Sequence, residues 1–504
     1  LTSCGDFLNV TPKDRISDAA MWSDEIHADL FLNNVYASIQ GPFGTHDPAE
    51  NCSDNSMNGV SGLPSQTLYA ISAYTPSDIL RGWDWSVNSE WNYYNFVRSA
   101  NVFIKNVSES EALPNDWKMQ RVAEARFLRA YFYSILATHY GGVPIITDVL
   151  NYSTQGDDIF FPRNSAEETF LFIIDECGEI ANDLPLKAEA GRASRGAALA
   201  LKGWIELFWA SPLYNENNDK ARWTAAATTN KQIIDLDVYD LFPDYAALFM
   251  EENNNNVEVI FDKPYLGGTN LGSSKEGLQG PAFSRDGRLL SWGAINPTQE
   301  LVDEYCMSNG LPITHPESGY DPQNPYENRE KRFYQSICHD GSEWLGETVI
   351  MKQGVGSPNA TDLSSSSERT NTGYYPLKGI QSQYAMPGHN QLSSANFILF
   401  RYAEVLLSYA EAQNEAVGPD ESVYNAINQI RQRSELPPLE TGLTQDEMRN
   451  VIHRERRVEL AFEEKRWYDL LRLKIAEEKL NGYLHAMVIE IEDGEWVYKI
   501  APAA

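Results

Sequence analysis

The chain has 504 residues and more acidic than basic side chains, 71 against 40, so its formal net charge is −31. This charge argues against nucleic acid as a partner, because a phosphate backbone needs lysine and arginine, and against docking on anionic lipid through a basic patch. The chain is long enough to bury a sizeable core, and no apolar run reaches the roughly 18–20 residues of a membrane span. We therefore expect a water-soluble body.

The first 20 residues are predicted to form an extended, polar tail. They begin Leu-Thr-Ser-Cys, which is similar to the end of a bacterial lipoprotein signal, where cleavage precedes a cysteine that is then lipidated. We predict that Cys4 is the lipidated residue and that the signal peptide has been removed; the alternative is that Cys4 is an ordinary residue. Two or three acyl chains, as bacterial lipoproteins carry, would make the anchor durable.

A run of amphipathic helices is predicted for the first half of the chain. Ala123, Ala130 and Ala137 recur at intervals of seven, as do small residues around Gly203, and such faces let neighbouring helices approach closely. A capping box begins at Ser165. The expected helices cover about 22–40, 89–106, 122–140, 165–183, 195–210 and 221–236, with a loop-rich segment at 41–88.

Residues 251–395 differ from the helical parts. Runs of asparagine (253–256) and serine (364–367) punctuate the segment, and short apolar runs at 257–261 and 348–351 suggest brief strands. Long irregular segments in compact proteins are often functional. We interpret this region as an insertion packed on a helical scaffold, with residues 41–88 beside it.

Three more helices follow near the C-terminus. Tyr402 and Tyr409 are seven residues apart on one face, and Gly418 ends that helix. A second helix follows, and a capping box of Thr444 and Glu447 starts the third. Helices joined by short turns, with small residues on the contact face, are the unit of a helical repeat. They resemble tetratricopeptide units without a clean 34-residue motif.

The predicted fold class is mainly α: a tetratricopeptide-like scaffold of about four helical pairs with a large, irregular, loop-rich insertion that contains short strands. We expect a tether over 1–20 and a single domain over 21–504. Within that domain, the helical scaffold covers 21–250 and 396–480, and the insertion covers 251–395.

Three C-terminal stretches carry a family resemblance: RYAEVLLSYAEAQNEA (401–416), NQIRQRSELP (428–437) and ERRVELAFEEKRWYDLLR (455–472). They closely resemble the C-terminal signature of the RagB/SusD family. Segments at 21–39, 89–104, 122–146, 296–313 and 326–337 resemble the same family in the same order. The resemblance implies a SusD-like surface glycan-binding lipoprotein of a Bacteroidetes nutrient-uptake system. It also implies an outer-membrane, cell-surface location and a SusC-like TonB-dependent transporter as partner.

Charged residues in this C-terminal stretch also have a purely structural interpretation. They lie three and four residues apart, which permits ion pairs along a helix. We therefore predict a structural network rather than a binding site for Arg454, Glu455, Arg456, Glu459, Glu463, Arg466 and Asp469.

Sugar-binding candidates are aromatic residues in loops, because indole and phenol rings stack on the apolar face of a sugar. The best cluster has Trp83 and Trp85 two residues apart, so an extended backbone places both indoles on one side. Arg81 and Asn88 flank them and can bond hydroxyls. The resemblance supports this loop, since family members bind glycan in the loop before the following helix. In the alternative, one Trp fills the joint between loop and helix.

Other candidates lie elsewhere in the loops. Asp54 could accept hydrogen bonds from hydroxyls, although an Asx-turn or cap is the alternative. Tyr265 and Trp292 come from the insertion, and a core role competes for Trp292. Trp344, Tyr374 and Tyr375 are weaker candidates, and Trp91 is expected in the core.

We predict that the protein is not an enzyme and needs no cofactor or metal, although an incidental surface Ca²⁺ is conceivable. The sequence contains no GxSxG, HExxH, Walker A or strand-placed GxGxxG motif. His339 and Asp340 are expected to be a solvated pair. The predicted function is capture of oligosaccharide or polysaccharide and delivery to the transporter. The alternatives are a peptide- or protein-binding helical-repeat surface protein and, much less favoured, a glycan-cleaving enzyme.

Overall fold

The computed structural model describes residues 18–44, 49–60, 90–285, 288–357, 359–364, 369–385 and 391–503. They fall into two compact units. One unit takes its described residues from 1–39 and 89–198, and the other from 40–88 and 199–504. This boundary lies within a helix and not at the predicted edge of the insertion. The prediction of one domain over 21–504 stays a prediction.

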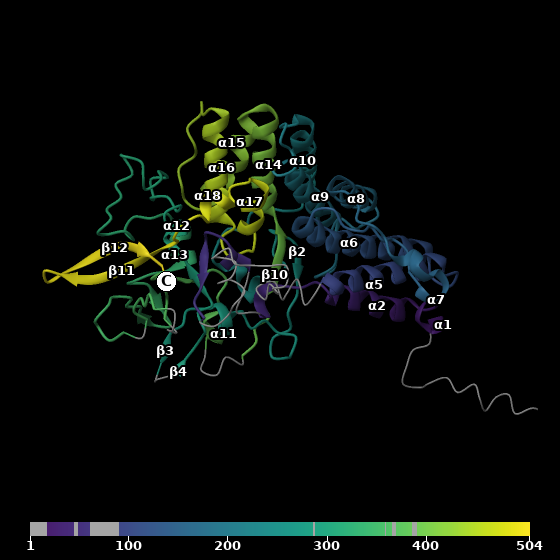
Figure 1. Cartoon of the computed structure of the whole chain (residues 1–504), viewed down its shortest axis with the longest axis horizontal. Helices are drawn as coiled ribbons and strands as arrows, with labels where there is room; N and C mark the ends of the chain where they lie inside the picture. Colours follow the sequence, from purple (N-terminus) through teal and green to yellow (C-terminus); the bar gives the residue numbers. More distant parts are fainter. Residues whose placement is uncertain are drawn as a thin grey trace, which may run out of the picture. The chain divides into compact units, whose positions relative to one another are not determined.

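The first unit is a group of packed helices (Figure 1). Its long helices are α2 (Glu25–Ala37), α5 (Glu90–Glu109), α6 (Asn115–Tyr140) and α8 (Ala166–Ile180); the short ones are α1 (Asp18–Met21), α7 (Tyr152–Gln155) and the 3₁₀ turn η4 (Gly156–Ile159). Helix α6 packs on both α5 and α8. Ala123, Ala130 and Ala137 are buried along it, as their spacing predicts. The capping box that begins at Ser165 is present.

The second unit contains the remaining helical scaffold: α9 (Arg195–Ala210, of which residues 199–210 belong here), α10 (Lys220–Ile234), α14 (Tyr402–Val417), α15 (Glu421–Arg433), α16 (Gln445–Glu459), α17 (Arg466–Arg472) and α18 (Ala476–Lys479). Helix α14 packs against α10, α15 and α16 (Figure 1). Gly203 permits close packing of α9 on α10, because a Cβ there would lie 2.8 Å from the Asn230 amide nitrogen. The Gly418 cap and the Thr444–Glu447 capping box are present.

The parts of the chain between the long helices, at 42–58 and 247–401, contain short helices and two-stranded sheets. The short helices are η1 (Pro42–Gly44), η2 (Ala49–Cys52), η5 (Ala247–Phe249), η6 (Glu251–Asn253), α11 (Lys275–Gln279), α12 (Gln299–Val302), α13 (Lys331–Ser336) and η7 (Ser382–Tyr384). The antiparallel pairs are β1 (Ser56–Asn58) with β5 (Ile295–Pro297), β2 (Val259–Lys263) with β10 (Phe397–Arg401), β3 (Ser284–Arg285) with β4 (Arg288–Leu289), β6 (Ile337–Cys338) with β9 (Tyr375–Pro376), and β7 (Glu343–Trp344) with β8 (Glu347–Thr348).

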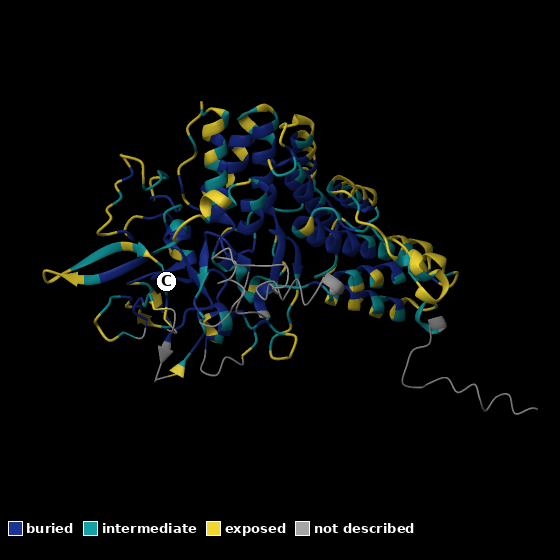
Figure 2. Cartoon of the chain, in the orientation of Figure 1, coloured by how far each residue is buried: buried dark blue, intermediate teal, exposed yellow. Residues whose placement is uncertain are grey.

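The predicted fold class is confirmed: the protein is mainly α, with helical pairs and an insertion of short strands. Two details differ from the sequence analysis. The strand expected at 348–351 is limited to Glu347–Thr348, and a hairpin of β11 (His485–Glu492) and β12 (Glu495–Pro502) follows the helical scaffold. Figure 2 shows that the tip of this hairpin is exposed whereas α14 is almost entirely buried.

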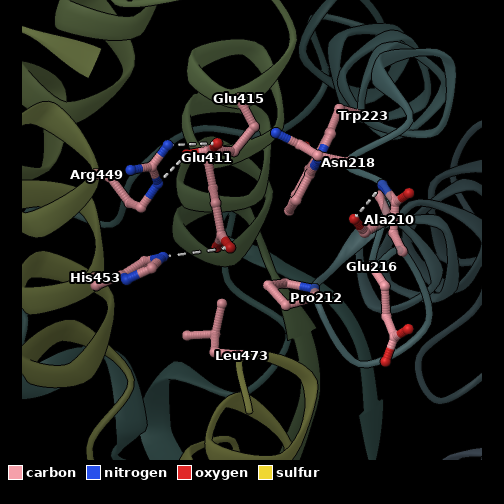
Figure 3. A pocket seen from close by; sticks show the side chains of 11 residues that line it. Ala210, Pro212, Glu216, Asn218, Trp223, Glu411, Glu415, Arg449, His453 and Leu473 are labelled. Carbon is pink, nitrogen blue, oxygen red and sulfur yellow. Dashed lines mark hydrogen bonds and ion pairs between the residues drawn. The ribbon is translucent and has the colours of Figure 1, made fainter. Parts of the chain in front are cut away.

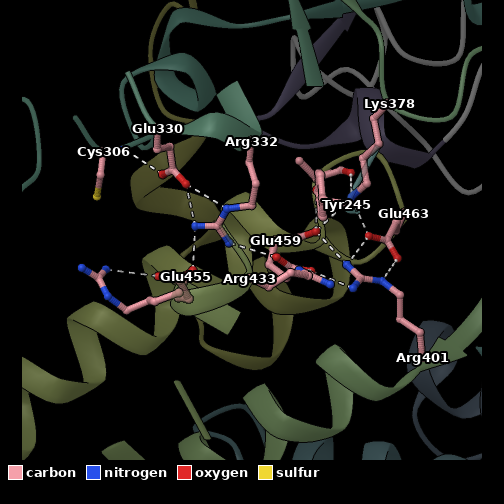
Figure 4. A network of polar contacts seen from close by, with 12 residues as sticks. Tyr245, Cys306, Glu330, Arg332, Lys378, Arg401, Arg433, Glu455, Glu459 and Glu463 are labelled. Carbon is pink, nitrogen blue, oxygen red and sulfur yellow. Dashed lines mark hydrogen bonds and ion pairs between the residues drawn. The ribbon is translucent and has the colours of Figure 1, made fainter. Parts of the chain in front are cut away.

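A buried network of charges joins the C-terminal helices to the insertion (Figure 4). Glu459, the last residue of α16, has no exposed surface. Its carboxylate accepts hydrogen bonds from Arg332 of α13 (2.9 Å), Arg401 of β10 (2.7 Å) and Arg433 of α15. Burial alone would raise the pKa of Glu459, but the three guanidinium groups hold it well below its usual range. One carboxylate thus ties together three segments that are distant in sequence.

The network extends from Glu459 on both sides. Arg401 also binds Glu258 (2.7 Å) and Glu463 (2.6 Å), and Lys378 donates to Glu463 (2.6 Å). Burial lowers the pKa of Lys378 to about 8. The prediction of a structural network is therefore confirmed. The sequence analysis expected ion pairs along one helix, whereas most ion pairs drawn in Figure 4 join two different helices, strands or loops. The end of α16 is buried, so its charges must find partners on the surrounding segments.

Replacing Glu459 with Gln should destabilise the protein strongly, because it leaves buried arginines without their shared counter-charge. Breaking one partner of a buried ion pair typically costs about 3–5 kcal/mol. The matched control is Asp235→Asn, which removes an exposed i,i+4 partner of Lys231 and should change the free energy of unfolding by about 1 kcal/mol or less. Urea unfolding of the two variants checks this, and equal losses would contradict the central role of Glu459.

Candidate functional site

Asp54 is a buried ion-pair partner, with 1% of its surface exposed. Arg466 donates to both carboxylate oxygens, at 2.7 and 2.8 Å, and Arg457 lies 3.0 Å from Oδ2. Although burial alone would raise the pKa of Asp54, Arg457 and Arg466 hold it below its usual value. This burial and pairing do not fit the predicted role as an acceptor for sugar hydroxyls. The sequence cannot show that two arginines more than 400 positions away meet this carboxylate.

The backbone that follows Asp54 lies beside Trp292. Strand β1 pairs with β5, with Asn58 opposite Ile295 and Ser56 opposite Pro297. The Trp292 amide donates to the carbonyl of Gly277 in α11 (3.0 Å), and its side chain is half-buried. Two candidate regions from different parts of the sequence therefore meet at one small sheet.

This strand pairing depends on a glycine. A Cβ on Gly59 would lie 2.1 Å from the carbonyl oxygen of Gly293, which no side chain allows. The Gly59 amide donates to Ala294 (3.4 Å), and Asn371 donates to the Asn58 carbonyl (3.1 Å). The position of the chain as it leaves β1 is thus set by close backbone contact with the segment that carries Trp292.

Tyr265 contacts Phe43 of η1, and η1 packs on α11. Its ring stacks on Phe43, with centroids 5.7 Å apart and an interplanar angle of 28°. Burial raises the pKa of Tyr265. Ser274 donates to the Phe43 carbonyl (2.9 Å), and Gln279 donates to the Pro42 carbonyl (2.8 Å).

Helix α11 therefore holds both groups of candidate aromatics. Ser274, which precedes the helix, and Gln279, its last residue, donate to the backbone at Phe43 and Pro42. Gly277, in the middle of the helix, accepts from the Trp292 amide. We call the group formed by Tyr265, Phe43, α11 and Trp292 the aromatic platform; Phe43 and most of α11 are buried, and Tyr265 and Trp292 are its half-buried members. Arg81, Trp83, Trp85, Asn88 and Cys4 lie outside the described residues, as does the side chain of Trp91.

The weaker aromatic candidates are core residues. Trp344, Tyr374 and Tyr375 expose at most 8% of their surface and pack in apolar clusters of the second unit, which does not fit a ligand-stacking role. The predicted solvated pair is wrong: His339 and Asp340 are both buried. The imidazole of His339 stacks on Phe333, with centroids 5.2 Å apart, and burial lowers its pKa to about 4.

Glu50 and Glu464 form a pair of buried carboxyl groups that the sequence analysis did not identify. The pair contacts the residues that lead into β1. Glu50 of η2 is fully buried and accepts from Asn55 (2.8 Å) and from the Phe462 amide (3.0 Å). Glu464 accepts from the Glu50 amide (3.3 Å). Burial first, and then the nearby Glu50 charge, raises the pKa of Glu464 to about 8. The pair therefore keeps a proton at neutral pH.

The described residues contain no group of three or more His, Cys, Asp or Glu side chains placed to hold a metal ion. Within the same residues, the helices are all too short or too polar to cross a membrane. Cys52, Cys177, Cys306 and Cys338 are buried. The partly accessible aromatic side chains of the platform are Tyr265 and Trp292.

Stability should fall as pH rises through the window between the ordinary glutamate pKa of 4.5 and the folded-state value of about 8. The folded state binds the proton of Glu464 more tightly than the unfolded chain does, so this contribution is present at low pH and is lost on deprotonation. Glu464→Gln should flatten this decline, because the amide cannot ionise. Glu495→Gln, at an exposed hairpin position, is the control. Thermal unfolding at a series of pH values checks the slope, and an unchanged slope in Glu464→Gln would contradict the assignment.

Gly59→Ala should weaken the β1–β5 pairing and destabilise the platform by about 1–3 kcal/mol, the typical loss for overpacking. Gly156→Ala is the comparison: its φ of +55° disfavours alanine, but no atom lies near the added Cβ, so it reports backbone strain without a clash. If the clash matters, chemical unfolding of Gly59→Ala shows the larger loss, and faster hydrogen exchange appears at the residue 59 amide, which donates to the Ala294 carbonyl. Equal behaviour of the two variants would mean that close approach is unimportant.

Two family models match the chain. One, described as the SusD family, matches residues 257–498, and the other, described as "Starch-binding associating with outer membrane", matches residues 6–207. The chain is 26% identical to SusD-like protein P38 of Formosa agariphila, over 97% of this chain and 92% of that protein.

Solved structures share the fold over nearly the whole length. A SusD-like protein from Bacteroides fragilis has a TM-score of 0.79 and 28% identity, covering 98% of this chain and 94% of that one. A second structure from the same species, titled a SusD-like carbohydrate binding protein, has a TM-score of 0.78 and 26% identity over 92% of this chain and 89% of its own. The similarity includes both compact units and the platform segments.

Proposed function

Because this chain belongs to the RagB/SusD family, we propose that it captures oligosaccharide or polysaccharide at the cell surface and delivers it to a SusC-like TonB-dependent outer-membrane transporter. The observation that carries this proposal is similarity along almost the entire chain to a structure titled a carbohydrate binding protein. The family description associates such proteins with the outer membrane. Lipidation of Cys4 would tether the protein there, and the transporter partnership rests on the family resemblance.

The proposed sugar site combines Trp83 and Trp85 with the aromatic platform. Indole faces would stack on the apolar side of sugar rings, and Arg81 and Asn88 would bond hydroxyls. Trp292 and Tyr265, both half-buried, remain candidates for direct contact.

The proposed mechanism is capture and release, in which no bond of the glycan is broken. Sugar hydroxyls exchange water for protein partners with little net gain, so each site should bind modestly. A rigid platform offsets part of this limit, because it need not be ordered when the ligand binds. The close Gly59–Gly293 contact and the α11 hydrogen bonds supply such rigidity.

Trp83→Ala and Trp85→Ala should weaken binding of the cognate polysaccharide by about tenfold, since each removes one stacking face worth about 0.5–1.5 kcal/mol beyond its buried area. Trp292→Ala should have a smaller effect. Affinity electrophoresis in gels that contain candidate polysaccharides measures the loss of retardation.

The matched control is Trp496→Ala in hairpin strand β12, which should leave retardation unchanged. Equal retardation of all four variants would place the site elsewhere. Absence of retardation by every polysaccharide, together with binding to peptides, would overturn the proposed function in favour of peptide uptake.

A further inference from the structure

A hollow of about 280 Å³ lies in the second unit among helices α10, α14 and α16 and the turn that follows α9 (Figure 3). None of its lining residues belongs to the aromatic platform. A protein cavity of about 150 Å³ can hold a benzene ring, so a ligand of the size of one sugar ring fits this larger hollow.

One side of the hollow is apolar. The indole of Trp223 forms part of the wall, held by its Nε1–H, which donates to Asn218 Oδ1 at 2.9 Å. Ala210, Pro212 and Leu473 also line the space. Flat and aliphatic groups of this kind cover the C–H face of a ring.

The other side is polar, and its carboxylates are already paired with cations; Arg449 also binds Asp446 outside the lining. Glu411 is bound by Arg472 at 2.5 and 2.7 Å, and Glu415 by Arg449 at 2.5 and 2.7 Å. At the rim, Glu216 lies 3.3 Å from the Lys474 ammonium. Each of these three lining carboxylates thus has a cation beside it. A charged ligand would have to disrupt such pairs, whereas a neutral ligand would not.

Hydrogen-bonding side chains that line the hollow remain partly accessible. His453 lies 3.5 Å from Glu411 and Arg449 binds Glu415, and 26% and 31% of their side-chain surfaces are exposed. The Asn218 amide is exposed at the rim. Figure 3 shows Arg449 and His453 on the side opposite Trp223 and Asn218. An apolar wall with a few convergent polar groups is the usual form of a small-molecule site.

We infer that this hollow binds one neutral pyranose residue, as a second sugar site built into the helical scaffold. The ring would lie against Pro212 and Leu473, with the largely buried Trp223 behind them, and its hydroxyls would meet His453, Arg449 and Asn218. This inference goes beyond the proposed function, which locates glycan binding on loops near the platform. Two sites on one chain would raise the overall affinity for a polysaccharide without any new contact at either.

Saturation-transfer difference NMR with methyl pyranosides of glucose, galactose, mannose and xylose tests the inference on the whole chain. At least one should bind saturably with a Kd of about 1 mM, corresponding to about −4 kcal/mol. In a chain that also carries Trp83→Ala and Trp85→Ala, Leu473→Trp fills the hollow and should abolish this signal. His453→Ala should weaken binding about fivefold. His315→Ala, at an exposed turn outside the hollow, should leave it unchanged.

The two sites are separated by their variants. Trp83→Ala with Trp85→Ala should leave binding of the monosaccharide at the hollow intact, and Leu473→Trp should leave most retention by polysaccharide gels intact. If no methyl pyranoside binds, or if Leu473→Trp binds as well as wild type, the hollow is not a sugar site, although the proposed function stands. If glucosamine binds much more tightly than glucose, the assignment to a neutral sugar is wrong. If the wild-type chain is not retarded by any polysaccharide gel, the proposed function is overturned instead.

Discussion

The structure of the second unit depends on a carboxylate at the end of α16. Glu459 is buried, and three arginines from α13, β10 and α15 bind it. Removing such charges from water costs several kcal/mol per ion, so the arrangement is favourable only when every partner arrives in its correct place. A displaced strand or helix would leave a buried charge unpaired. The network therefore selects one packing of the insertion on the helices, while apolar contact supplies most of the driving force.

The same region of the chain positions the candidate site. Two residues before Glu459, Arg457 contacts Asn55 (2.8 Å) and Asp54, and Arg466 at the start of α17 binds Asp54. These contacts hold the residues that lead into β1, and β1 holds the segment with Trp292. Charges that stabilise the core thus fix the backbone of the aromatic platform, which is the kind of support that a preorganised binding surface needs.

Ion pairs also connect this core to the hollow among the helices. Arg456 binds Asp469 (2.9 Å), Asp469 accepts from Arg472 (2.8 Å), and Arg472 binds Glu411 in the wall of the hollow. Because each lining carboxylate is paired with a cation, a neutral ligand can enter the hollow without breaking an ion pair. The acidic net charge of the whole chain is therefore a poor guide to the ligand chemistry of this site.

The sequence by itself determined the elements that depend on local interactions. Periodic alanines marked α6, capping boxes marked α8 and α16, and Gly418 marked the end of α14, because each acts within one or two turns of the chain. The motifs of the C-terminal helices also identified the family. Only the tertiary structure decided which side chains are accessible. Asp54, Trp344, Tyr374 and Tyr375 have the residue types of a sugar site, but contacts with distant segments bury them. The Glu50–Glu464 pair and the hollow beside Trp223 are likewise formed by segments hundreds of residues apart, and no local pattern encodes such a meeting.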